Sequence, residues 1–215
     1  MSNAGREFLG GNDEDKTFEN CSSMKTASGA AEELKSFVGR LTSYYSKNAD
    51  TPDFGKRRAE RAILRRNAGK TLADSRGADL IFFGLSPPKL WDAREGDWDG
   101  HERAFLLATL FCLAGGAKGA SLGKEMRLYA KERDRESAVS RRLMVLLDCV
   151  EPERLAFHLR QLVKMLVSEG RGLDWFRLAE DLRLWNHPDR IVQRRWADEF
   201  MRLPKLSTEE NQNEE

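Results

Sequence analysis

Apolar residues recur at helical spacing through most of the chain, and this periodicity limits the fold more than any other feature. The clearest case is the stripe Leu155, Leu159, Leu162 and Leu166, whose spacing places all four side chains on one side of an α-helix. Leu, Ala, Arg, Lys and Glu dominate, whereas alternating runs of β-branched residues are scarce. The sequence therefore predicts an all-α protein, a helical bundle.

Start and stop signals divide this pattern into separate helices. Gly115-Gly116 ends one helix, Ser121 is a candidate N-cap for the next, and Glu151-Pro152-Glu153 combines Pro in a first turn with acids near the positive end of the helix dipole. The predicted helices cover about 29–47, 55–68, 77–84, 101–114, 122–132, 136–149, 151–170, 174–185 and 190–203.

The same signals predict the domain organisation. A boundary near 115–121 gives an N-terminal helical lobe, 28–116, and a C-terminal helical lobe, 117–206. The segments 1–27 and 207–215 are polar and acidic, and we expect both to be disordered tails.

Several classes of protein are excluded by composition. The chain has no run of eighteen apolar residues and no apolar signal segment, so we expect neither a membrane partner nor secretion. Cys21, Cys112 and Cys149 are odd in number and widely spaced, which predicts neither a disulfide framework nor a metal site. We expect Cys112 and Cys149 to be buried and reduced, as in a cytoplasmic protein.

The formal net charge of +1 conceals a basic folded part. Residues 1–24 hold five acids and two bases, and residues 207–215 hold four acids and no base. Residues 25–206 hold 34 Lys and Arg against 26 Asp and Glu, a net charge of +8. This excess favours a polyanionic partner.

Helical projection places much of this charge opposite the predicted core. Segment 56–70 holds seven bases and one acid, a density that costs like-charge repulsion unless a polyanion relieves it. For any single helix a solvated face is the alternative, but the set together predicts contact with a nucleic-acid backbone, without base reading. The candidate residues are Arg57, Arg61, Arg65, Arg66, Lys124, Arg127, Lys131, Arg141, Arg142, Arg160, Lys164, Arg190 and Arg194.

No pattern in the sequence predicts catalysis, a cofactor or a metal. His101, His158 and His187 lie far apart, and the acidic stretch 92–99 lacks the spacing of an EF-hand. Segment 115–119 is rich in glycine but lacks the P-loop spacing, so we interpret it as a link between helices. Trp175, Trp185 and Trp196 fall at helical positions with Leu, which favours the core over base stacking.

Several short segments, in this order, resemble the CasB family, the small subunit of the type I-E CRISPR surveillance complex Cascade. The resemblance covers about residues 30–203, and the joint order and spacing of its segments are more specific than any one of them. The segments are Ile63-Leu64-Arg65-Arg66, Ala108-Thr109-Leu110-Phe111-Cys112-Leu113, Ser121-Leu122-Gly123-Lys124, Ser140-Arg141-Arg142-Leu143, His158-Leu159-Arg160-Gln161-Leu162-Val163, Leu173-Asp174-Trp175, Leu184-Trp185 and Arg194-Arg195-Trp196-Ala197-Asp198-Glu199-Phe200.

The resemblance implies a non-enzymatic subunit of two helical lobes, two copies of which lie head-to-tail along the complex. The implied partners are the CRISPR RNA, the target and non-target DNA strands, and the backbone and large subunits of Cascade. The implied role is to stabilise the R-loop through basic faces. Arg195 is a further candidate residue, because it lies in a segment that matches the family. It also flanks an apolar stripe, so a structural contact is the alternative role for Arg195. A different reading of the same basic faces is an assembly protein that meets acidic protein partners, and a third is a metal-dependent nuclease built on Asp97 and Asp99.

Overall fold

The structure is a computed structural model that describes residues 15–46, 53–88 and 100–202, with side chains of the first helix described from Gly29. These residues form nine helices and no β-strand, which confirms the predicted all-α class. The helices are α1 (Asp15–Ser46), α2 (Phe54–Arg66), α3 (Asp79–Gly84), α4 (Gly100–Leu113), α5 (Leu122–Glu132), α6 (Glu136–Leu147), α7 (Pro152–Val167), α8 (Trp175–Arg183) and α9 (Ile191–Met201).

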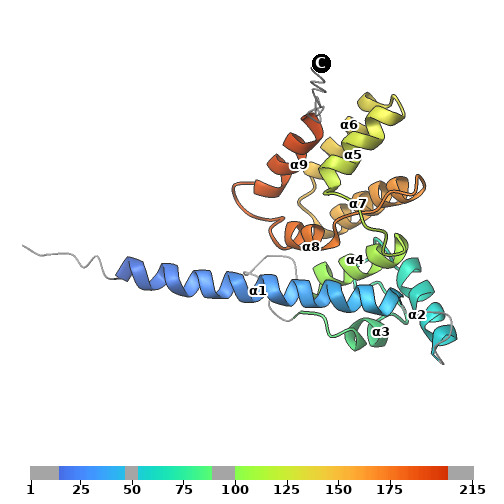
Figure 1. Cartoon of the computed structure of the whole chain (residues 1–215), viewed down its shortest axis with the longest axis horizontal. Coiled ribbons are helices and arrows are strands. Elements are labelled where there is room, and N and C mark those ends of the chain that lie inside the picture. Colours follow the sequence, from blue (N-terminus) through green and yellow to red (C-terminus); the bar gives the residue numbers. More distant parts are fainter. Residues whose placement is uncertain (1–14, 47–52, 89–99, 203–215) are drawn as a thin grey trace, which may run out of the picture.

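The helices form two groups that share one core. Figure 1 shows α1–α4 in the lower half of the view and α5–α9 in the upper half. Helix α4 is apolar on nearly every side and is buried from Arg103 to Cys112, because α1, α2, α7 and α8 all pack against it. The buried apolar residues form one continuous cluster from Leu34 in α1 to Phe200 in α9. The two-lobe division remains a prediction, and the core continues across its boundary.

The loop between α4 and α5 packs closely against the loop between α7 and α8. Lys118 and Leu173 form an isolated β-bridge, and the Trp175 indole Nε1 donates to the Ala117 carbonyl at 2.8 Å. A Cβ on Gly172 would lie 2.4 Å from the Ala117 carbonyl oxygen, so only glycine permits this approach. This contact fixes how α5 leaves the lower group of helices.

The helix starts show two different outcomes. Asp174 caps α8 as its position suggests, since its carboxylate accepts from the Arg177 backbone N–H at 2.9 Å. Ser121 precedes α5 as predicted but makes no capping bond; its hydroxyl donates to the Glu199 carboxylate of α9 at 2.7 Å. The Ser121 side chain therefore joins two helices instead of capping one.

The first helix is longer than the sequence pattern predicts. It begins at Asp15, whereas disorder is predicted through residue 27 and a helix from residue 29. The reason is that residues 15–28 contain neither Gly nor Pro, so nothing in this segment stops a helix that continues into the packed part. Residues 1–14 and 203–215 lie outside the described residues, and so do the predicted acidic tail 207–215 and the stretch 92–99.

Buried positions follow the predicted apolar stripes closely. Trp175, Trp185 and Trp196 are all buried, and Cys112 and Cys149 are buried free cysteines. Within the described residues, no helix is both long enough and apolar enough to cross a membrane.

Candidate nucleic-acid interface

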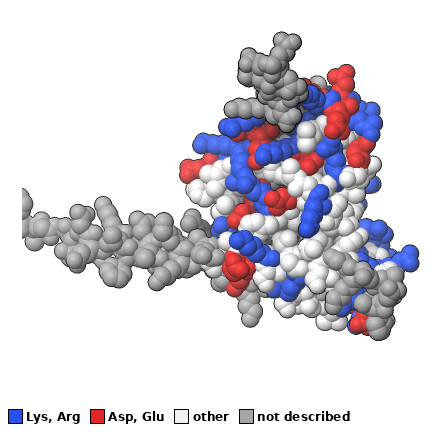
Figure 2. All heavy atoms as spheres, viewed as in Figure 1, with Lys and Arg blue, Asp and Glu red and all other residues white. Residues whose placement is uncertain are grey.

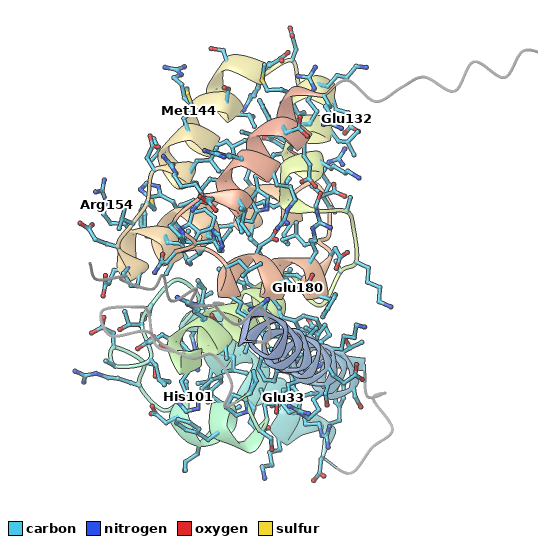
Figure 3. The ribbon with its side chains drawn as sticks, turned by 90° about the vertical axis from the view of Figure 1, so that its left-hand side faces the viewer. Glu33, His101, Glu132, Met144, Arg154 and Glu180 are labelled. Carbon is cyan, nitrogen blue, oxygen red and sulfur yellow. The ribbon has the colours of Figure 1, made fainter. Side chains whose placement is uncertain are left out.

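A groove of about 730 Å³ lies between α6 and α7, and basic side chains line it. Helix α6 turns Val139, Leu143 and Leu146 into the core, which leaves Arg141 and Arg142 on its exposed side. Lys164 of α7 is exposed across the groove. In Figure 3, Met144 marks α6 and Arg154 marks the start of α7, and the two helices lie at one edge of the upper group.

The cations of this groove have no acidic partner. Among the described residues, Arg141, Arg142 and Lys164 form no ion pair, and no carboxylate lines the groove. Their polar contacts are weak, because Arg142 donates to the Met165 sulfur at 3.1 Å and Arg141 Nε approaches a carbonyl at 3.4 Å. Most of their N–H donors are therefore available to an anion.

Helix α2 carries a second basic surface. Arg65 and Arg66 are exposed at its last turn, and among the described residues neither forms an ion pair. Arg57 and Arg61 are half-buried, with their guanidinium groups over the rings of Tyr44 and Tyr45 at 5.6 and 4.8 Å. The predicted residues of α2 thus divide into two exposed cations and two cations held by aromatic rings. Figure 2 shows basic side chains at the lower right, where Figure 1 places α2.

Arg160 connects the two surfaces. Its side chain is half-buried and lies against Gly69, which follows α2 and has φ +80°. A Cβ on Gly69 would lie 2.5 Å from Arg160 Cδ, so this contact requires glycine. Arg160 therefore brings α7 beside the C-terminal end of α2, and it has a packing role in addition to the predicted one.

Arg127 is predicted opposite the core of α5, and this position is wrong. The residue is 9 % exposed, pairs with Glu136 and lies over the Phe200 ring at 6.0 Å. The projection assumed a single buried face, but α9 packs along the flank of α5 and covers Arg127. Lys124 and Lys131 of the same helix are exposed as predicted.

The predicted basic residues around α9 also divide into side chains that contact the protein itself and one that is exposed. Arg190 is exposed but already occupied, since it pairs with Asp148 at 3.3 Å and donates to the Leu147 carbonyl at 2.7 Å. Arg195 pairs with Asp181, so it makes the structural contact that was the alternative role for this residue. Arg194 is exposed. Among the described residues, Arg194 is the candidate near α9 that is exposed and forms no ion pair, like the cations of the groove.

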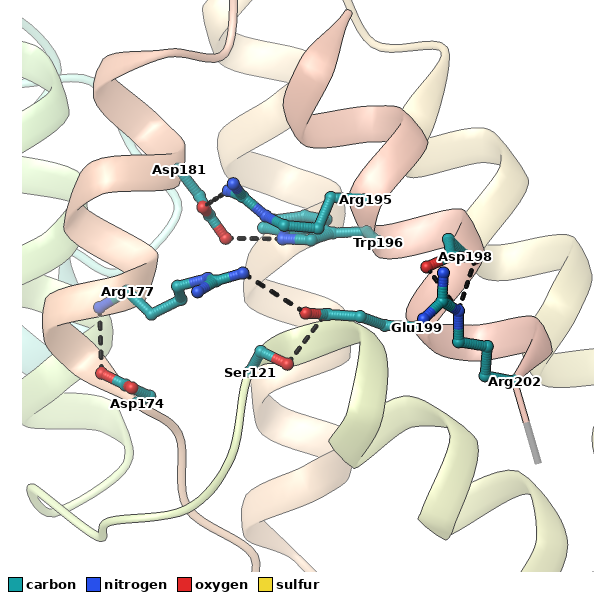
Figure 4. Close-up of polar contacts among 9 residues, drawn as sticks. All are labelled: Ser121, Asp174, Arg177, Asp181, Arg195, Trp196, Asp198, Glu199 and Arg202. Atoms are coloured by element: carbon teal, nitrogen blue, oxygen red, sulfur yellow. Dashed lines mark hydrogen bonds and ion pairs between the residues drawn. The ribbon is translucent and has the colours of Figure 1, made fainter. Parts of the chain in front are cut away.

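Asp181 forms a buried polar cluster that the sequence does not reveal (Figure 4). Its side chain is 1 % exposed, pairs with Arg195 of α9 and accepts from the Trp196 indole Nε1 at 2.6 Å. Burial raises the pKa of Asp181 to about 6, and the Trp196 bond and the charges of Arg195 and Arg177 only partly oppose this. The cluster joins α8 to α9 and faces inward, so we assign it to stability.

The described residues contain no group of three His, Cys, Asp or Glu side chains that could hold a metal ion. The acidic stretch 92–99, with Asp97 and Asp99, lies outside them. His187 lies 3.8 Å from Asp189, its neighbour in an exposed loop, while His101 and His158 lie on α4 and α7. The three histidines do not converge on one site.

The fold and the groove define an all-helical protein with a basic groove whose cations pair with no acid among the described residues. The model of the CRISPR-associated protein Cse2 family matches residues 60–200, and the chain belongs to this family. The resemblance to CasB is thereby confirmed.

Three known proteins show the extent of the similarity. A Cse2 protein of Thermus thermophilus is 37% identical over 108 residues, which are 49% of this chain and 61% of that protein, so the match spans less than two thirds of the relative. The crystal structure of CasB from Thermobifida fusca has a TM-score of 0.58 at 22% identity and covers 78% of this chain and 97% of that one. A chain of a CRISPR RNA-guided surveillance complex has a TM-score of 0.59 at 20% identity and covers 79% and 92%.

Proposed function

We propose that this chain is a non-catalytic small subunit of a type I-E CRISPR surveillance complex, Cascade, in which it holds nucleic-acid backbone and stabilises the R-loop. The family membership supports the CRISPR role, and the similarity in fold to a chain of a CRISPR RNA-guided surveillance complex supports a place in such an assembly. The partners are the CRISPR RNA, the target and displaced DNA strands, the backbone and large subunits, and a second copy of this chain, all in the cytoplasm.

The groove between α6 and α7 is the observation that carries the proposal. Arg141, Arg142 and Lys164 line one hollow of about 730 Å³ without a carboxylate among the lining residues. Three cations held together in this way repel one another, and a phosphate backbone relieves that repulsion. Arg fits this task because its planar fork of N–H donors matches phosphate oxygens.

The energetics of R-loop formation make such a subunit useful. Opening a DNA duplex and forming a guide–target hybrid exchanges two nearly equal stabilities, so modest contacts to backbone shift the balance. A displaced strand needs a basic path more than base-specific hydrogen bonds. Arg141, Arg142 and Lys164 provide one part of such a path, and Arg65 and Arg66 provide another, beside Arg160.

A charge-reversal variant of the groove tests the proposal. Complexes are reconstituted with Arg141→Glu, Arg142→Glu and Lys164→Glu combined, and target DNA binding is measured by gel shift. We expect normal assembly and an affinity weakened more than tenfold. The matched control reverses three exposed cations outside the groove, Arg76, Arg154 and Arg202, and is expected to change the affinity less than threefold. Equal losses in the two variants would contradict a specific role of the groove.

An assembly protein with acidic protein partners is the second candidate. Exposed apolar side chains near the groove favour a protein contact at this face, since Met144, Val145 and Phe157 are all about half exposed. The same groove variant distinguishes the two functions. Loss of assembly, with unchanged DNA affinity in the complexes that do form, would support the assembly role and overturn the proposal.

A further inference from the structure

A second hollow, of about 350 Å³, lies on the other group of helices and has a different construction from the groove. Its lining residues come from the end of α1, from α2 and from α4: Tyr45, Phe54, Arg58, Arg61, Ala62, Arg65 and Cys112. Arg58, Arg61 and Arg65 follow one another at intervals of three and four residues, so they share one face of α2 and converge on this space.

The central guanidinium is fixed before any ligand arrives. Arg61 Nη1 donates to the Tyr45 carbonyl at 2.8 Å, and its guanidinium lies over the rings of Tyr45 at 4.8 Å and Phe54 at 5.9 Å. A cation held by two rings and a carbonyl loses little conformational freedom on binding, which raises affinity for a ligand that fits. Its remaining N–H donors are left for an acceptor in the hollow.

Among the described residues, no carboxylate lines this hollow. Glu60, the acid of α2, lies elsewhere on the helix, where the Tyr44 hydroxyl donates to it at 2.6 Å and Lys56 approaches it at 4.0 Å. Among the described residues, Arg58 and Arg65 have no ion pair. Burial raises the pKa of the Cys112 thiol to about 12, so the wall that Cys112 supplies is neutral.

We propose that this hollow is a binding site for a phosphate monoester, with Arg61 as the fixed receptor and Arg58 and Arg65 as flanking cations. A doubly charged terminal phosphate suits this site better than a singly charged internal phosphodiester, because three cations line one hollow and can act on the same phosphate. The ligand is either a free nucleotide or the phosphorylated end of a strand. This inference rests on the proposed function, because it names a ligand for the basic surface on α2. The hollow shares no lining residue with the groove between α6 and α7.

Isothermal titration calorimetry on the full chain tests the site with AMP, with inorganic phosphate, and with one ten-nucleotide DNA carrying either a 5′-phosphate or a 5′-hydroxyl. We expect saturable 1:1 binding of AMP, and a 5′-phosphate that strengthens oligonucleotide binding at least tenfold. Competition of AMP with the phosphorylated strand places both sources at one site. If AMP binds but the 5′-phosphate has no effect, the free nucleotide is the ligand.

Variants separate this site from the groove. Arg58→Gln combined with Arg65→Gln changes two exposed side chains, so the fold should persist, and AMP binding should weaken at least tenfold. Arg61→Lys keeps the charge but loses the planar fork, and a similar loss is expected. The groove variant at Arg141, Arg142 and Lys164 should leave AMP binding unchanged even if the proposed function fails. Absence of saturable AMP and phosphate binding by the unaltered chain, or equal loss in the groove variant, would overturn the assignment.

Discussion

The buried carboxylate of Asp181 makes folding stability depend on pH in an unusual direction. Burial raises its pKa from 3.8 to about 6, so the folded protein holds this proton more tightly than the unfolded chain does. A group of this kind favours the folded state below pH 4 and loses that contribution as pH rises through 6. With about 1.4 kcal/mol for each pKa unit, the whole change is about 3 kcal/mol, of which about 2 kcal/mol falls between pH 4 and 7.

Asp181→Asn isolates this contribution. The amide keeps an oxygen that can accept from the Trp196 indole, but it has no proton to exchange in this pH range. All other titrating groups are common to both proteins and largely cancel in their difference. The unfolding free energy of the natural chain, relative to that of the variant, should therefore fall by about 2 kcal/mol from pH 4 to 7.

Urea unfolding followed by tryptophan fluorescence at several pH values measures this difference, because Trp185 and Trp196 are buried side by side with ring centroids 5.2 Å apart. A difference that does not vary with pH would refute the reasoning. The opposite slope would mean that the ion pair with Arg195, which is 31 % exposed, outweighs burial and lowers the pKa instead.

Two further substitutions follow from packing. Gly69→Ala should lower the free energy of unfolding by about 2 to 3 kcal/mol in thermal unfolding, because the added Cβ combines an unfavourable φ with a clash against Arg160. Gly77→Ala is the matched control. Gly77 has φ +71° but lies in open space, so this variant should cost only about 1 kcal/mol. Equal costs would show that Arg160 yields freely. Arg127→Ala should lower stability by about 2 kcal/mol and leave the DNA affinity of the folded complex unchanged, whereas Lys124→Ala, at an exposed position, should change stability by less than about 0.5 kcal/mol. A DNA defect in Arg127→Ala without loss of stability would contradict its burial.

The helices and the apolar faces were predictable because they depend on local spacing. The stripe from Leu155 to Leu166 is buried along its length, and the predicted limits of α5 agree with those in the structure. Periodicity reports one buried face well, and Gly, Pro and capping residues mark where each helix ends.

The polar partners were not predictable, because they depend on which helices meet. Arg195 and Asp181 lie 14 residues apart and Arg190 and Asp148 lie 42 apart, so no local pattern reveals either pair. Arg127 looked exposed because projection considers one neighbour, whereas a helix in a bundle has several. The candidate list therefore contained side chains that bind the protein itself, together with the unpaired cations of the groove.

The groove was predictable only in part. Arg141, Arg142 and Lys164 were each predicted from their own helix, but that α6 and α7 place them around one hollow is a fact of packing. Likewise, the seven bases in 56–70 predicted charge repulsion within this segment. The rings of Tyr44 and Tyr45 that hold Arg57 and Arg61 belong to α1, so these contacts depend on how α1 packs against α2.

The salt dependence of target DNA binding by the reconstituted complex tests the central claim most directly. Arg141→Gln, Arg142→Gln and Lys164→Gln together remove three proposed phosphate contacts. For a single strand, the slope of log affinity against log salt should become shallower by about 2. With equal affinities of the two complexes at about 1 M salt, this slope difference corresponds to about fifty-fold weaker binding near 0.15 M salt. A normally assembled complex that keeps both the slope and the affinity of the natural one would contradict the claim that this groove holds nucleic-acid backbone.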